Sequence, residues 1–168
     1  MGALFHAIGG PAFSFASIDY MHKVHSLRDA AAEHPALETV VAFDREAGRL
    51  RTQGSRARNL WRVLNALRFV QVLLDGLVDE EAPLRPLIQS AYDETMAATH
   101  IWAIRQAVWL ALFAAPSRAT FVESLSQHGG HSRQQMEAAA ARYVAASKVV
   151  IARLDALYPE PCVDAEGN

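Results

Sequence analysis

Apolar residues recur at intervals of three and four along almost the whole chain, which is the spacing of amphipathic α-helices. No run of alternating β-branched residues, the pattern of a half-buried strand, competes with it. The pattern predicts helices over about residues 11–32, 36–51, 56–78, 87–115, 117–127 and 133–158. We therefore expect an all-α protein, a two-layer sandwich of about seven helices.

Proline and glycine mark the predicted helix ends. Pro11 suits the first turn of a helix, and Pro35 ends that helix because the residue before a proline avoids the α region. Pro116 ends the fourth helix, and Gly129–Gly130 separates the last two. Ser132 is expected to cap the final helix through its side-chain oxygen.

Length and composition indicate one compact unit. A chain of 168 residues suits a single domain, which we expect over residues 1–158 with a C-terminal tail at 159–168. Hydrophobic residues make up 51% and charged residues 20%, which is typical of folded rather than disordered chains. The formal net charge of −2 gives no overall attraction for nucleic acid, so we expect no nucleic-acid partner and only a local basic site.

Cysteine usage and the apolar runs bear on the compartment. The single cysteine, Cys162, excludes a disulfide framework and a cysteine-based zinc site, and it suits a reducing environment. The opening residues have no positive n-region, and their apolar run breaks at Gly9–Gly10, so they do not predict a signal peptide. The longest apolar candidate, residues 107–115, is too short to span a bilayer. We therefore expect a cytoplasmic protein.

Two pairs of charged residues stand one turn apart on predicted helices. Asp19 and Lys23 form one pair, and Arg58 and Arg62 form the other, within the largely apolar stretch RNLWRVLNALRF. The simplest interpretation of the first pair is a solvated ion pair on the helix surface. The two arginines repel each other slightly and would ordinarily reach separate carboxylates.

A histidine lies within the predicted fourth helix. His100 is close to Thr99 and Trp102. A lone histidine beside tryptophan is ordinarily a packed, hydrogen-bonded core residue. The chain is also rich in phenylalanine, tryptophan, leucine and alanine, which suit the lining of an apolar interior.

Taken together, these residues predict a more specific site. Two stacked guanidinium groups and the ammonium group of Lys23 form a set of donors for a dianion such as a phosphate monoester. Asp19 would accept a hydrogen bond from an amide N–H or a hydroxyl, and His100 would donate one to a carbonyl. A ligand with a phosphate, an amide and a hydroxyl, bound in an apolar interior, is an anionic sphingolipid.

The remaining histidines permit an alternative, a metal site in a helical bundle. His22 and His25 lie three residues apart on a predicted helix, and His128 and His131 have the same spacing around two glycines. No repeated Glu-x-x-His pattern accompanies them, as a carboxylate-rich bundle site would require. We therefore expect no metal and no cofactor, and a metal protein or enzyme of this kind is the less favoured alternative.

Three stretches of the sequence resemble the glycolipid transfer protein superfamily. They are GGPAFSFASID followed by YMHK, then RNLWRVLNALRFVQVLLDGL, and AYDETMAATHIWAIRQAVWLALFAAPSRATFVESL, which carries a histidine-x-tryptophan element at His100 and Trp102. Their order and spacing are similar over about residues 3–157. The resemblance implies a glycolipid transfer protein-like fold and non-vesicular lipid transfer without enzymatic activity.

The resemblance also implies which headgroup is bound. Family members that bind sugars carry tryptophan where this chain has Arg62 and asparagine where it has Lys23. Members that bind ceramide-1-phosphate carry lysine and two arginines at the positions matching Lys23, Arg58 and Arg62. We therefore expect a phosphate-bearing sphingolipid as the ligand, with Asp19 and His100 on its amide group, and transient contact with a membrane surface.

Apolar residues are assigned to the hydrocarbon chains by the same resemblance. The expected pocket lining is Phe13, Leu67, Phe69, Val108 and Leu112. Each of these is equally well explained as an ordinary core residue. Trp102 is expected beside the headgroup site or at the membrane interface, where tryptophan is favoured.

The N-terminal stretch departs from the family pattern. Members usually have a fuller helix ahead of the Gly–Pro break, whereas residues 1–8 precede it here. A shortened cover would leave the pocket more open or require a second chain, so a homodimer is one possible arrangement. Two other functions stay open from the sequence, a lipid sensor on the same fold and a purely structural interaction domain.

Overall fold

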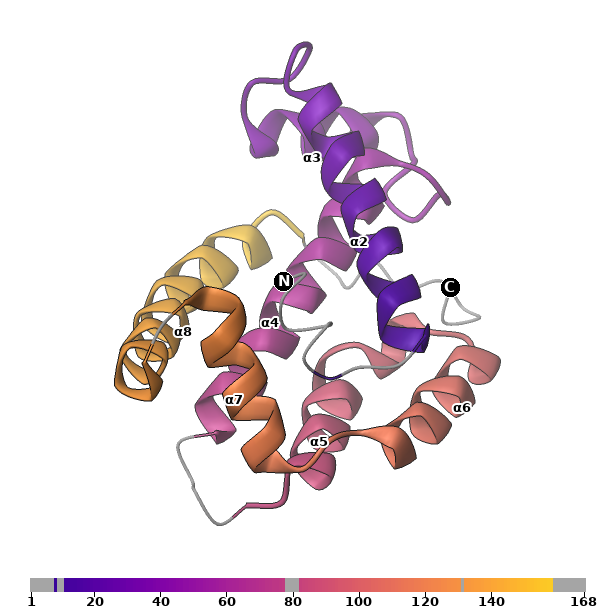
Figure 1. Ribbon diagram of the computed structural model, residues 1–168. Helices are drawn as coiled ribbons and strands as arrows, with labels where there is room; N and C mark the ends of the chain where they lie inside the picture. Colours follow the sequence, from indigo (N-terminus) through magenta and orange to yellow (C-terminus); the bar gives the residue numbers. More distant parts are fainter. Residues whose placement is uncertain (1–7, 9–10, 78–81, 131, 159–168) are drawn as a thin grey trace.

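The computed structural model describes residues 8, 11–77, 82–130 and 132–158, with the backbone alone at 11–15, 128 and 129. Within this part the protein contains seven α-helices, two short 3₁₀ helices and no strand (Figure 1). The elements are α2 (Pro11–Ala30), α3 (Leu37–Glu46), α4 (Arg56–Gly76), α5 (Leu84–Thr95), η1 (Ala97–Thr99), α6 (Trp102–Ala111), η2 (Leu112–Ala114), α7 (Arg118–Gly129) and α8 (Arg133–Asp155). The prediction of an all-α protein is confirmed.

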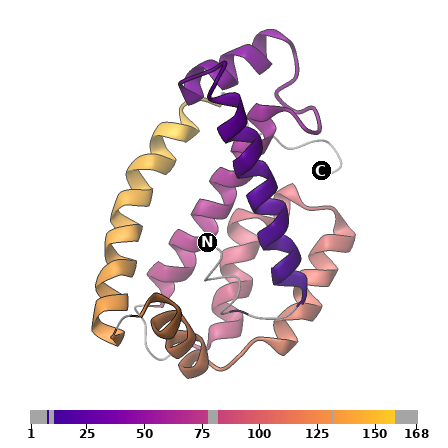
Figure 2. The ribbon, with the colours of Figure 1, turned by 45° about the horizontal axis from the view of Figure 1, so that its top comes forward.

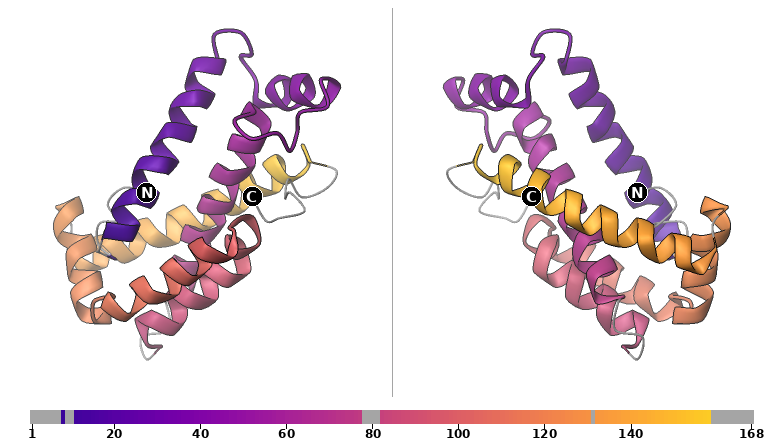
Figure 3. Two further views of the ribbon diagram at one scale, coloured as in Figure 1. Left: turned by 90° about the vertical axis from the view of Figure 1, so that its right-hand side faces the viewer. Right: turned by 90° about the vertical axis from the view of Figure 1, so that its left-hand side faces the viewer.

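Helix α4 is the central element. It packs against α2, α3, α5 and α8, and α2 and α8 flank it on opposite sides (Figure 2). More than half of its 21 residues are buried, as expected for a helix covered nearly all round. From α5 the chain returns through η1, α6 and η2, and both 3₁₀ helices contact α5 (Figure 3). The helices are therefore layered around α4.

Serine side chains begin three of the helices. Ser55 accepts from the third backbone N–H of α4 at 3.1 Å, and Ser117 does the same for α7 at 3.2 Å. Ser132 accepts from Gln135 N–H at 3.3 Å, and the Gln135 side chain accepts in return from Ser132 N–H at 2.8 Å. This reciprocal capping box confirms the predicted cap of the last helix. Gly130, with φ of +61°, ends α7 at the predicted break.

Helix α3 is shorter than the predicted segment 36–51 and ends at Glu46. Gly48 has φ of +67°, which lets Arg49 N–H donate to Asp44 O at 2.7 Å and Gly48 N–H donate to Arg45 O at 3.0 Å. These two bonds form a Schellman motif, the usual helix end at a left-handed glycine. The apolar spacing continues past Gly48, whereas the helix ends before it. The predicted end at residue 51 was therefore wrong.

The predicted single helix over 87–115 is also wrong. The chain forms α5, leaves helical geometry at His100 (φ −115°, ψ 136°) and resumes as α6. No proline or glycine marks this break. Instead, Thr95 Oγ1 donates to Ala91 O at 2.6 Å and Thr99 Oγ1 donates to Met96 O at 2.8 Å, and such bonds compete with helix propagation. His100 therefore lies in an extended link between two helices and not inside one.

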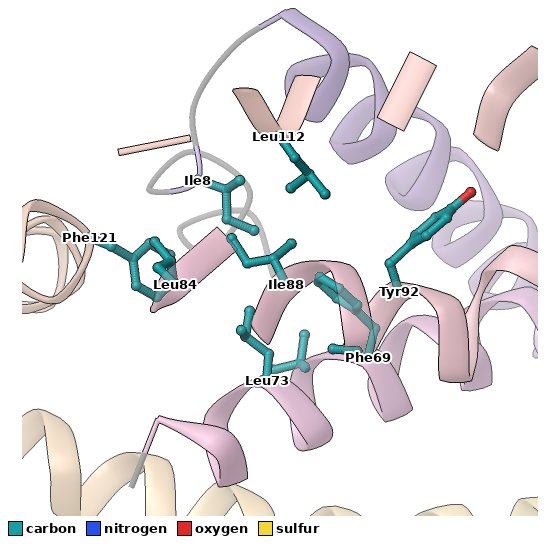
Figure 4. Packing of buried hydrophobic residues seen from close by; sticks show 10 residues of the cluster. Ile8, Phe69, Leu73, Leu84, Ile88, Tyr92, Leu112 and Phe121 are labelled. Atoms are coloured by element: carbon teal, nitrogen blue, oxygen red, sulfur yellow. The ribbon is translucent and has the colours of Figure 1, made fainter. Parts of the chain in front are cut away.

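Two clusters of buried side chains form the core, and α4 contributes to both. The first joins α4 to α5, η2 and α7 (Figure 4), and consists of Ile8, Phe69, Val70, Leu73, Leu84, Ile88, Ala91, Tyr92, Leu112 and Phe121. The second joins α3, α4 and α8, and consists of Val41, Ala57, Leu60, Trp61, Leu64, Ile151, Leu154 and Tyr158. None of the described helices is both long and apolar enough to cross a bilayer.

A buried carboxylate fixes the start of α4. Asp44 is 2% exposed, and its Oδ2 accepts from Ala57 N–H at 2.8 Å. Its Oδ1 lies 3.1 Å from the guanidinium group of Arg49. Ala57 is the second residue of α4, so Asp44 caps this helix together with Ser55 and places a negative charge at its positive end.

Replacing Asp44 by alanine is expected to lower the free energy of unfolding by about 1–3 kcal/mol, because the buried Ala57 N–H would lose its acceptor. Urea denaturation followed by circular dichroism measures the change. The exposed Asp29 gives the control, since Asp29→Ala is expected to change the free energy by less than about 0.5 kcal/mol. Equal stability of Asp44→Ala and wild type would contradict this role for the carboxylate.

Candidate functional site

Charged residues from three elements converge at the N-terminal half of α4. Asp19 and Lys23 come from α2, Arg62 comes from α4, and His100 comes from the link before α6. Helix α2 packs against both α4 and α6. The charges of Arg62, Asp19 and Lys23 all act on the pKa of His100, so these four side chains share one electrostatic environment.

Two arginines of α4 lie one helical turn apart at this site. Arg58 is only 7% exposed, and Arg62 is partly buried. The backbone N–H of Arg58 is held by the cap at Ser55. Ser55 and Asp44 both cap the first turn of α4, which carries Arg58. The backbone that bears the Arg58 side chain is therefore held in place.

Lys23 and Asp19 form the opposite wall on α2. The Lys23 ammonium group donates to Asp19 Oδ1, and its side chain is 14% exposed whereas that of Asp19 is 57% exposed. The lysine is therefore turned inward and the carboxylate stands at the rim. Of the side chains that act on His100, Arg62 and Lys23 are cationic and Asp19 is anionic, so this group carries an excess of positive charge.

His100 is neutral in this setting. Burial, followed by the positive charge of Arg62, lowers its pKa to about 4, against a raising effect of Asp19 and a further lowering effect of Lys23. Its Nδ1 lies 2.9 Å from the hydroxyl of Tyr92. A neutral imidazole has one N–H, so His100 is able to donate a single hydrogen bond.

The depressed pKa of His100 links stability to pH. Its value of about 4 in the folded protein is below the usual 6.5, so the unfolded chain binds more protons between these limits. The contribution of His100, at most about 3 kcal/mol, is present above pH ~6.5 and is lost as pH falls towards ~4. Urea denaturation of wild type at pH 7, 5.5 and 4.5 is therefore expected to show a steeper loss than His100→Gln, with the exposed His22→Gln as control. Identical pH dependence in His100→Gln and wild type would contradict the assignment.

Tyr92 belongs to the site although the sequence did not indicate it. It lies on α5, is 5% exposed, and burial is the main cause that raises its pKa to about 12. On a continuous helix, residues 92 and 100 would be about 12 Å apart along the axis. The break before α6 brings His100 back to Tyr92. The prediction of one continuous helix over this segment could therefore not reveal the contact.

Three of the residues assigned to the hydrocarbon chains lie together, and Leu67 lies apart from them. Phe69 and Leu112 are buried in the first cluster, with Val108 packed against it. Leu67 packs against the second cluster instead. The side chain of Phe13 lies outside the described part of the structure.

A groove of about 950 Å³ runs between the end of α4 and helices α7 and α8. Its apolar lining includes Leu74, Leu77, Val122, Met136 and Val144. Of the residues expected to line the lipid pocket, the four with described side chains, Leu67, Phe69, Val108 and Leu112, do not contribute to it. Leu74, Leu77 and Val122 also pack against the first cluster, so the groove borders the core that holds Phe69 and Leu112.

Helix α6 carries an exposed apolar surface. None of its residues is buried, and Trp102 is 68% exposed. Leu110 and Phe113 are 61% and 55% exposed, and the rings of Trp109 and Phe113 meet edge to face with centroids 4.8 Å apart. We call Trp102, Ile104, Trp109 and Leu110 of α6, together with Phe113 of η2, the α6 surface. Trp102, expected beside the headgroup site or at a membrane, is thus a solvent-exposed residue next to His100.

The metal alternative finds no support in the described residues. There, no three histidine, cysteine, aspartate or glutamate side chains come together in a group able to hold an ion. His22 and His25 are exposed on α2. The side chain of His128, and His131 and Cys162, lie outside the part of the chain that the structure describes.

Fold and site together define an all-helical protein with two cationic side chains and a carboxylate around a buried histidine. A family model described as glycolipid transfer protein (GLTP) matches residues 2–127. Accelerated cell death 11 of Arabidopsis thaliana is 34% identical over 151 residues, which cover 89% of this chain and 71% of that protein. The ceramide-1-phosphate transfer protein of Rattus norvegicus is 35% identical over 143 residues, covering 76% of this chain and 65% of that protein.

Solved structures agree with these relatives. A crystal structure of a mutant of Arabidopsis accelerated cell death 11 complexed with C12 ceramide-1-phosphate matches with a TM-score of 0.83 and 33% identity, covering 93% of this chain and 76% of that one. The chain belongs to the glycolipid transfer protein family, and the resemblance found in its sequence is confirmed.

Proposed function

We propose that this protein binds a sphingolipid of the ceramide-1-phosphate type and moves it between membranes. The observation that carries the proposal is the convergence of Arg62, Lys23 and Asp19 around His100 from three separate elements. The names of the relatives support the same ligand class.

Each side chain has a role that its chemistry permits. Arg58, Arg62 and Lys23 bind the phosphate, because guanidinium groups offer paired donors to its oxygens. Asp19, at the rim, accepts from the amide N–H of the ceramide. His100 donates to the amide carbonyl, which a neutral imidazole is able to do. No covalent bond is made or broken in this scheme, so it requires no nucleophile.

The hydrocarbon chains supply the reason for a protein carrier. A ceramide carries about thirty methylene groups, and exposing them to water costs on the order of 20 kcal/mol. Phe69 follows Arg62 by two turns on the same face of α4 and belongs to the first cluster. We place the chains there, between Phe69, Val108 and Leu112, below the headgroup site.

The α6 surface is the part of the protein that we assign to the membrane. Trp102 and Leu110 stand out from a helix that begins directly after His100. Tryptophan is favoured at the boundary between headgroups and acyl chains, and apolar side chains gain by leaving water there. Contact through α6 would bring the headgroup site to the lipid surface.

The headgroup assignment is tested by vesicle-to-vesicle transfer of two ceramides. Fluorescent ceramide-1-phosphate is expected to move at least about tenfold faster than galactosylceramide, because Arg62 and Lys23 recognise phosphate and offer no stacking surface to a sugar. Similar rates for the two lipids would contradict the assignment. Binding of ceramide-1-phosphate without transfer would instead indicate a lipid sensor.

A further inference from the structure

The contact between Tyr92 and His100 joins the core to the headgroup site. The Tyr92 hydroxyl lies 2.9 Å from Nδ1 of His100, and the two ring centroids are 5.7 Å apart. Tyr92 is a member of the first cluster, and Figure 4 shows its hydroxyl directed away from the other labelled side chains. Tyr92, a residue of the packed core, is therefore hydrogen-bonded to His100, which lies in the extended link between two helices.

Two directions of this hydrogen bond are chemically conceivable. In the first, Tyr92 O–H donates to Nδ1, and the imidazole carries its proton on Nε2. In the second, Nδ1–H donates to the Tyr92 oxygen, and Nε2 is a bare acceptor. Burial raises the pKa of Tyr92 to about 12 and lowers that of His100 to about 4, so at neutral pH each group holds one proton.

The second direction leaves a buried proton unsatisfied. Among the described residues the Tyr92 hydroxyl hydrogen-bonds to His100 alone. If it accepted from Nδ1, its own proton would find no acceptor there, and a buried donor without a partner is costly. The first direction satisfies both groups and leaves Nε2–H as the one ring donor available to a ligand.

We propose that Tyr92 is a positioning residue, whose hydroxyl donates to Nδ1 of His100 and fixes the imidazole with its proton on Nε2. His100 lies between η1 and α6 in extended backbone, so no helical turn of its own holds the ring. Tyr92, on α5, supplies that constraint. Because the site then presents a donor, the ligand group beside His100 must be an acceptor; this consequence rests on the proposed function, in which it is the amide carbonyl.

The direction of the hydrogen bond is decided without any ligand. Nitrogen-15 spectra of histidine-labelled wild-type protein at neutral pH are expected to show His100 with a protonated Nε2 and a bare, hydrogen-bonded Nδ1. In Tyr92→Phe, which keeps the ring, the Nδ1 signal is expected to shift as its donor is lost. A protonated Nδ1 in wild type, or an unchanged Nδ1 signal in Tyr92→Phe, would overturn the proposal.

The role in binding is tested with vesicles that contain ceramide-1-phosphate. Tyr92→Phe is expected to weaken binding about three- to tenfold, and to have no further effect in a His100→Leu background, because Tyr92 acts through the imidazole. Tyr143→Phe is the matched control: Tyr143 is partly buried and burial raises its pKa to about 12, as for Tyr92, but its buried hydroxyl has no hydrogen-bond partner among the described residues. It is expected to bind like wild type.

Two results would show that Tyr92 only supports the fold: an equal loss with and without His100, or an equal loss in Tyr143→Phe. Wild-type protein that fails to bind ceramide-1-phosphate would overturn the proposed function instead. The nitrogen spectra would still decide the direction of the hydrogen bond.

Discussion

Replacement of Arg62 by leucine is expected to slow the transfer of ceramide-1-phosphate about 10- to 100-fold. A charge-assisted hydrogen bond to a desolvated phosphate contributes about 1.5–3 kcal/mol, and leucine keeps the bulk of the side chain but offers no donor. Arg58→Leu is expected to have an effect of the same size, since Arg58 is 7% exposed and its contact with the phosphate would be shielded from water. The measurement is fluorescence transfer between donor and acceptor vesicles.

Stability separates this loss from unfolding. Removing one partner of a buried charged contact lowers stability, so Arg58→Leu and Arg62→Leu are expected to melt below the wild-type temperature but to stay folded at the temperature of the transfer assay, which circular dichroism checks. Arg142, an exposed arginine of α8, provides the control, and Arg142→Leu is expected to transfer at the wild-type rate. A wild-type rate in either α4 variant would refute the phosphate assignment.

The sequence predicted the site by chemistry and family resemblance rather than by spacing. The interval of four residues places Arg58 above Arg62 on a helix, and α4 bears this out. The interval does not say that α2 and the link before α6 pack on that face, because such contacts depend on the whole fold. The three motif stretches of the family carried that information.

Local signals account for most of the helix ends and for one of the errors. Ser132 and Gly129–Gly130 act as their residue types predict. Gly48 indicates the end of α3, but the prediction followed the apolar spacing and extended the helix past this glycine. At His100 there was no such signal, since the break arises from threonine bonds to the backbone and from a tertiary contact with Tyr92.

The expected pocket lining contained a conflict that geometry reveals. Leu67 and Phe69 are two residues apart on α4, so their side chains point about 200° apart around the helix. They are therefore poorly placed to line one cavity, and the structure assigns them to different clusters. Apolar composition also does not by itself indicate burial at α6, which has no buried residue although most of its residues are apolar.

The exposed apolar character of α6 leads to the second large effect. The double variant Trp102→Ala with Leu110→Ala is expected to partition onto anionic vesicles about 10- to 100-fold more weakly, because two apolar side chains would no longer leave water at the interface. Both are more than 60% exposed, so the fold is expected to tolerate the change. Vesicle sedimentation measures the partitioning. The control is Val149→Ala with Val150→Ala, which are 62% and 47% exposed on α8, across α4 from α2 (Figure 2).

The two sets of variants are expected to fail in opposite ways. Trp102→Ala with Leu110→Ala should bind a short-chain, water-soluble ceramide-1-phosphate like wild type but transfer the long-chain lipid slowly. Arg62→Leu should associate with neutral vesicles like wild type but lose the soluble ligand. If the α6 variant also lost the soluble ligand, the α6 surface would be part of the headgroup site. If it kept both vesicle association and transfer, the membrane would have to approach through another face of the protein.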